Sequence, residues 1–173
     1  MGPQFQVNTT TSGDQGYSKI AVSPDGSFLV VYYGLATYGI GGQRFAPDCS
    51  PVGDEFEVNS PSGFAARPDI SADDNGRYVA VWANSGNFGR LIPASGPPTG
   101  ETFTVPSEAF PVWWPFVAAY PDGRFVATWH SGGSTGSDND GYSIQARRFA
   151  GFTGIFFDGF ESGDTTAWTD TSP

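Results

Sequence analysis

Two adjacent tryptophans, Trp113 and Trp114 in the run PVWWPF, are well suited to binding a ligand. Indole faces stack on sugar rings and on other flat groups. At the position of Trp114, two related runs carry Tyr17 and Arg67, so these four residues are the predicted ligand contacts. Because neighbouring residues of a strand point to opposite sides, we expect one indole to face a ligand and the other to pack. A core or oligomer contact is the alternative use of the pair.

A loop rich in polar side chains, SGGSTGSDNDGYS, offers a second kind of site. Asp138, Asn139 and Asp140 provide the hard oxygen ligands that Ca²⁺ prefers, and the next residue is a glycine that permits a sharp turn. The run is not an EF-hand, since it lacks the first carboxylate and the closing Glu. These three residues are the candidate calcium ligands of the chain, although a solvated hairpin tip is the more common use of such a loop, and no other cofactor is expected.

Catalytic groups are present but have no evident partners. The acidic residues that could supply a glycosidase pair are Asp54, Glu55, Asp69, Asp73, Asp74 and Glu108. None has a sequence neighbour that would separate the pKa values of two carboxyls. The lone His130 has no adjacent nucleophile or metal ligand, and Cys49 is the only cysteine, so no disulfide forms within the chain. We therefore predict no enzyme activity.

The charge of the chain excludes two classes of partner. The formal net charge is -10, with only eight Lys and Arg among 173 residues. Nucleic acids and anionic membranes both require clustered positive charge, so neither is expected as a partner. No apolar run is long enough to cross a membrane, and the first residues, MGPQFQVN, lack the pattern of a signal peptide.

An internal repeat supplies the elements that must position these residues. The runs GPQFQVN, GDEFEVN and GETFTVP begin at Gly2, Gly53 and Gly100, which are 51 and 47 residues apart. Each is followed by a second short alternating run and then by one phrase, SPDGSFLVVY, DDNGRYVAVW or YPDGRFVATW. The units are predicted as residues 1–52, 53–99 and 100–150, with a tail at 151–173.

The repeated phrase predicts a hairpin turn and the strand that it begins. Asp or Asn followed by Gly suits the turn, because glycine adopts the left-handed conformation that the loop requires. After the turn both alternating sets of residues are largely apolar, as in Tyr78, Ala80 and Trp82 against Val79 and Val81. A strand of this kind is expected to be covered on both faces.

Four short strands in each unit of about 50 residues, one of them buried on both faces, are typical of a β-propeller blade. The predicted fold is all-β, with three propeller-like four-stranded repeats. A β-sandwich is the alternative. A closed propeller usually needs at least four blades. The chain is therefore expected to be an open arc, part of a longer array, or one that self-associates to complete a ring.

The units resemble a repeat of large bacterial secreted and surface proteins that reads G-x-x-F-x-V-N, P-D-G-x-F-V-V-x-W and Q-R-F. The resemblance spans Gly2 to Phe149; unit two closes with RLIPAS, and unit three has Pro106 in place of Asn. It implies blade-like repeats outside the cell, but no particular ligand, because turn and core residues carry the motif. The residues of unit one that match are Phe5, Val7, Asn8, Pro24, Asp25, Gly26, Phe28, Gln43, Arg44 and Phe45.

The tail, IFFDGFESGDTTAWTD, is similar to a short D-G-F-E-S-G-D-x-x-x-W ending of bacterial secreted proteins and to the first strand of some jelly-roll modules. The first similarity implies export or surface retention, and the second implies that a further domain begins here. Repeat arrays also need covered ends. We expect the tail to cap the last repeat with Phe156, Phe157, Phe160 and Trp168.

These observations predict an extracellular or cell-surface module that binds a glycan or protein through loops at one rim. It is expected to be non-catalytic, without nucleic-acid partners or membrane insertion. A truncated propeller hydrolase and a structural spacer are the alternatives. Carboxylates that converge near the central axis would favour the hydrolase, whereas an exposed aromatic shelf at Trp113 or Trp114 would favour glycan binding.

Overall fold

The computed structural model describes residues 2–35, 38–59, 64–98, 100–106, 112–138 and 140–151. In these ranges the chain forms eleven β-strands and no helix, which confirms the all-β prediction. The first sheet contains β1 (Gly16–Val22), β2 (Phe28–Leu35), β3 (Gly39–Phe45) and β4 (Pro51–Glu57). The second contains β5 (Ala66–Ala72), β6 (Tyr78–Ala83), β7 (Asn87–Ile92) and β8 (Phe103–Thr104). The third contains β9 (Val112–Ala119), β10 (Phe125–Ser131) and β11 (Ser143–Phe149).

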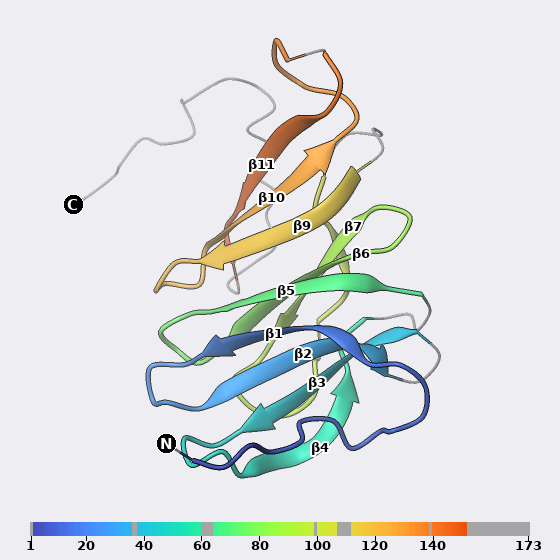
Figure 1. Ribbon diagram of the computed structural model, residues 1–173. Coiled ribbons are helices and arrows are strands. Elements are labelled where there is room, and N and C mark those ends of the chain that lie inside the picture. The colour runs from blue at the N-terminus through green and yellow to red at the C-terminus, as the bar shows by residue number, and fades with distance from the viewer. Residues whose placement is uncertain are drawn as a thin grey trace, which may run out of the picture.

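Each sheet is an antiparallel meander, because its strands pair in chain order. Figure 1 shows the three sheets stacked one above the other, with the second between the other two. Their first strands, β1, β5 and β9, lie side by side along one edge of the stack. The stack is open, and three separate sheets do not match the two-sheet sandwich that was the alternative. No helix that could span a membrane occurs in the described ranges.

The repeated phrase forms the turn that the sequence predicts. Gly26, Gly76 and Gly123 all have positive φ, at 85°, 72° and 92°. The amide of each glycine donates to the backbone oxygen of the residue three positions earlier, for example Gly26 to Ser23 at 2.9 Å. Glycine adopts a positive φ at little cost in free energy, so the turn forms readily at this position. The turn then sets the register between the first and second strands of each sheet.

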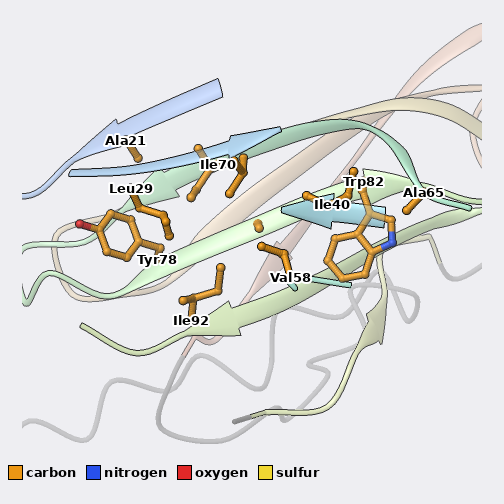
Figure 2. Packing of buried hydrophobic residues seen from close by; sticks show 11 residues of the cluster. Ala21, Leu29, Ile40, Val58, Ala65, Ile70, Tyr78, Trp82 and Ile92 are labelled. Carbon is orange, nitrogen blue, oxygen red and sulfur yellow. The ribbon is translucent and has the colours of Figure 1, made fainter. Parts of the chain in front are cut away.

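Burial on both faces is found for the second strand of the first two sheets and not for that of the last. Tyr78 and Trp82 of β6 enter the cluster shared by the first two sheets (Figure 2). Val79 and Val81 enter a separate cluster with the third sheet. In β10 the residues that point away from the second sheet, such as Val126, are only half-buried. The prediction of a strand buried on both faces is therefore confirmed for β6 and also for β2, in which Leu29, Val30, Val31 and Tyr32 are all buried. It is wrong for β10, because no described sheet lies against the outward face of the third sheet.

The sheets are offset from the sequence repeats by one strand. Strand β4 spans the boundary at Gly53 and pairs with β3 of the preceding unit, and β8 pairs in the same way with β7. Each of the first two sheets therefore borrows its fourth strand from the following repeat. The third sheet has three strands among the described residues. Counted by repeat, units two and three each contain four strands, whereas unit one contains three, because residues 2–8 form no strand. The predicted cap, at residues 155–170, lies outside the described residues.

Candidate functional site

A β-bulge interrupts the first strand of every sheet at the same position. The pairing register shifts after Gly16 in β1, after Ala66 in β5 and opposite Thr128–His130 in β9. Tyr17, Arg67 and Trp114 lie in these bulges with φ of 53°, 54° and 53°. A bulge inserts an extra residue on one strand and turns its side chain out of the regular alternation.

The three bulge residues, Tyr17, Arg67 and Trp114, form a column along the stack because their strands lie side by side; we call them the bulge column. The Cζ atom of Arg67 is 4.7 Å from the ring centroid of Trp114, which is a cation–π contact. All three line one groove of about 290 Å³. The structure thus brings together three of the four ligand contacts that the sequence predicted.

A larger cleft, of about 610 Å³, lies on the other side of Trp114, and Trp113 is part of it. Both tryptophans line this cleft and both are 41% exposed. The expectation that one indole would pack is therefore wrong, because the bulge breaks the alternation on which it rested. The lining residues are Phe64, Ala66, Arg67, Ala83, Asn84, Ser85, Gly86, Val112, Trp113, Trp114, His130 and Tyr142.

Aromatic rings hold the two tryptophans in place. Trp113 meets Tyr142 edge to face with centroids 5.4 Å apart, and Trp114 lies 4.8 Å from the ring of His130. His130 therefore packs in the cleft wall. Phe64 and Tyr142 are largely exposed, so the cleft presents several accessible apolar faces at once. An exposed cluster of aromatic side chains on a folded domain often marks a surface that binds a ligand or a partner.

Sequence reasoning missed the polar side of this cleft. Asn84 and Ser85 belong to the short β6–β7 connection, and Ser85 has a positive φ of 45°. Phe64 and Tyr142 reach the cleft from segments that lie before β5 and before β11. Tyr142 lies near the end of the polar loop SGGSTGSDNDGYS, which was the one signal that could have drawn attention to it. The other contributions arise only when neighbouring sheets stack.

The cleft lining has one cationic side chain, Arg67, and no carboxylate among the described residues, although the chain has a net charge of -10. The candidate acidic residues are engaged elsewhere. Asp69 accepts the Val117 amide, Asp73 is paired with Arg77 at 2.6 Å, and Glu55 accepts hydrogen bonds from Thr9 and Thr10. Asp54 and Asp74 are exposed, and Glu108 lies outside the described residues.

The predicted calcium loop gains no support from the structure. Asp138 and Asp140 are exposed, and Asn139 lies outside the described residues. Over the ranges that the structure describes, no group of three His, Cys, Asp or Glu side chains is arranged to hold a metal ion. Cys49 is exposed in a turn between β3 and β4.

Comparison with known proteins adds no assignment: no family model matches this chain, and no curated protein matches it. The site must therefore be interpreted from its own chemistry. That chemistry is a cleft between the second and third sheets, with two indoles, other aromatic rings, an arginine and small polar residues. It offers stacking surfaces and hydrogen-bond donors, and the part of its lining that the structure describes contains no pair of carboxyl groups.

Proposed function

We propose that the protein is a non-catalytic binding module that recognises a saccharide in the cleft lined by Trp113 and Trp114. The observation that carries the proposal is the joint exposure of both indoles in one cleft beside Arg67. The C–H faces of a sugar ring stack on indole, and its hydroxyl groups accept hydrogen bonds from guanidinium and amide groups. Arg67 and Asn84 supply such donors at the cleft wall.

Several features favour binding over hydrolysis at this place. Glycoside hydrolysis needs two carboxyl groups on either side of the scissile bond. The described residues that line the cleft include none, and Asp69 and Asp73 are held by contacts to the backbone or to arginine. The aromatic wall is already assembled in the protein, with Trp113 against Tyr142, so little ordering would accompany ligand binding.

The finer architecture belongs to the same proposal. We interpret the three sheets as blades of an open propeller, with β1, β5 and β9 as the innermost strands. The stacking of meander sheets and the alignment of their first strands support this interpretation. A saccharide-binding role would fit a protein that acts outside the cell or on its surface.

Binding to a glycan array, followed by calorimetry with the best saccharide, tests the proposal. Trp113→Ala and Trp114→Ala should each weaken binding about two- to tenfold, since aromatic stacking contacts contribute about 0.5–1.5 kcal/mol. Tyr120→Ala is the matched control, because Tyr120 is an exposed aromatic residue that does not line the cleft. That variant should bind like the unmodified protein.

Two results would contradict the assignment. The first is saccharide binding that neither tryptophan variant weakens. The second is the absence of any saccharide that binds, together with a protein partner whose binding depends on Trp113. Loss of binding in Tyr17→Ala alone would move the site from the cleft to the neighbouring groove, which Tyr17 lines.

A further inference from the structure

The forward face of a sheet is defined as the side turned toward the next sheet along the chain. It is covered by a neighbouring sheet in the first two sheets, whereas no described sheet lies against it in the third. Leu29 and Val79 lie at the same register position of β2 and β6, and both are buried. Val126 is their counterpart in β10 and is only half-buried. In the third strands, Ile40 is 0% exposed but its counterpart Ile144 is 69% exposed.

The opposite end of the stack has the complementary feature. Ile70 of β5 is buried against the first sheet. Ile20 and Val22 occupy the corresponding side of β1, which faces away from the second sheet, and both are exposed. The first sheet thus keeps the β1 part of this apolar surface exposed, while Val30 and Tyr32 of β2, on the same side, are already buried within the chain. The two ends of the stack are therefore complementary: in the described part of the chain, one end has a forward face without a following sheet, and the other has a face without a preceding sheet.

The fourth strands of the first two sheets share the short motif Phe-x-Val. Phe56 and Phe103 each lie opposite a glycine of the third strand, and a valine follows two residues later. Val58 donates its backbone N–H to the Ile40 oxygen at 2.8 Å, and Val105 donates to Asn87 at 2.9 Å. Both valines are fully buried. The Phe-x-Val motif therefore marks the strand that completes a sheet.

A third copy of this motif exists without a sheet of its own. Phe5 and Val7 repeat the pattern near the amino terminus, yet residues 2–8 belong to no strand. Among the described residues, β11 pairs only with β10 and has no fourth strand beside it. The segments that connect the motif to the next strand also agree in length. Phe56 precedes the first residue of β5 by ten positions, and Phe5 precedes the first residue of β1 by eleven.

We propose that Gly2–Asn8 of one copy pairs with β11 of a second copy, completing its third sheet, while the first sheet of the one covers the bare forward face of the other. Within a single molecule the second sheet lies between these two ends of the stack (Figure 1). The contact is head to tail, so it continues the stack from copy to copy and closes into a ring or extends as an array. It does not depend on the saccharide cleft.

The existing sheets predict the register of the added strand. Ile40 donates its N–H to the Asn59 side chain at 2.6 Å and accepts from Val58. By equivalence, Ile144 donates to Asn8 of the partner copy and accepts from that copy's Val7. Phe5 then lies opposite Ala146, where the first two sheets have Gly42 and Gly89. The extra methyl group crowds the ring.

In the free molecule the segment has another resting place. The ring of Phe5 lies 5.3 Å from Phe45, on the first sheet of its own chain, and Thr9 and Thr10 are bound by Glu55. Residues 2–6 remain exposed there. The segment thus covers only part of the first sheet, and its exchange to a partner requires the loss of few contacts.

Sedimentation velocity on the full chain over a wide concentration range provides the first test. We expect assemblies of two or more copies, and dissociation to monomers when residues 2–8 are deleted or when Val7→Asp is introduced. Gln4→Asp is the matched control, since Gln4 lies on the other face of the predicted strand from Phe5 and Val7. Circular dichroism establishes that each variant is folded. Ala146→Gly should tighten association about fivefold or more by removing the crowded methyl group.

Cross-linking between two differently substituted chains tests the register. In a Cys49→Ser background, mixed Gln6→Cys and Gln145→Cys chains should form an intermolecular disulfide, because these positions correspond to the pair Glu57 and Gly41. A mixture of Gln6→Cys and Asp25→Cys chains should not, since Asp25 lies in the turn between β1 and β2.

Three outcomes would overturn the proposal. The full chain could remain monomeric at every concentration. Assemblies could persist unchanged after deletion of residues 2–8, which would place the contact elsewhere. A chain ending at Gly151 could associate while the full chain does not, which would show that residues 152–173 occupy the edge of β11 themselves.

Discussion

A carboxylate oxygen of Asp69 accepts a hydrogen bond from the backbone N–H of Val117, 48 residues further along the chain, at 2.9 Å. The other carboxylate oxygen lies 3.8 Å from the ammonium group of Lys19. One side chain in β5 therefore contacts both neighbouring sheets. The Val117 amide belongs to β9, whose outer edge has no strand beside it among the described residues. Asp69 thus satisfies a donor that sheet pairing leaves open.

Asp69→Ala should lower the free energy of unfolding by about 1–3 kcal/mol, because it removes the acceptor of a partly buried amide. Asp69→Asn keeps an oxygen acceptor and should cost less. Urea unfolding measures both changes. Lys19→Met should change stability by less than about 1 kcal/mol, since the ion pair is partly exposed. Equal losses in the alanine and methionine variants would contradict this account.

Gly42→Ala should destabilise the protein by about 1–3 kcal/mol through overpacking. A Cβ atom at this position would lie 2.9 Å from the ring of Phe56, which covers the glycine from β4. Gly16→Ala is the control, because no atom lies within 4 Å of the corresponding position. Thermal and urea unfolding of the two variants should therefore differ, and indistinguishable stabilities would refute the close contact.

Acidification should weaken the attachment of the amino-terminal segment to β4. Burial raises the pKa of Glu55, but hydrogen bonds from Thr10 and Thr9 outweigh it, so the pKa lies below its ordinary value of 4.5. The stabilisation is therefore complete above pH 4.5 and is lost as the pH falls through the folded-state pKa.

Melting temperatures from pH 6 to pH 3 measure this effect. Glu55→Gln should be less stable than the unmodified protein near neutrality, and the difference should shrink in acid. Asp54→Asn, an exposed neighbour, serves as the control. A difference that stays constant across the range would show that Glu55 does not act through its charge.

Arg67→Val should destabilise the protein by about 1–3 kcal/mol, because a β-branched side chain is disfavoured at a φ of 54°. Arg67→Asn should cost less, since Asn tolerates the left-handed region. Both variants lose the contact with Trp114, so their comparison isolates the backbone. Equal unfolding free energies for the two would exclude strain at the bulge.

Local chemistry explains why much of the scaffold was predictable. Turn residues and alternation placed the hairpins at Gly26, Gly76 and Gly123, and two apolar faces placed β6 between two sheets. The doubly covered strand failed for β10, whose sequence is similar to that of β6. The residues of a strand indicate whether each of its faces can pack against another sheet. Whether a sheet actually lies there depends on the position of the strand in the stack.

The candidate site shows the same division. The sequence by itself determined the repeat, the turns, the all-β fold and three equivalent positions at Tyr17, Arg67 and Trp114, because short-range patterns encode them. Only the tertiary structure decided that a bulge exposes Trp113 and Trp114 together, and that the cleft takes residues from two sheets. The stacking of the sheets brings residues some 80 positions apart, such as Phe64 and Tyr142, to the lining of one cleft, and no local pattern in the chain records that proximity.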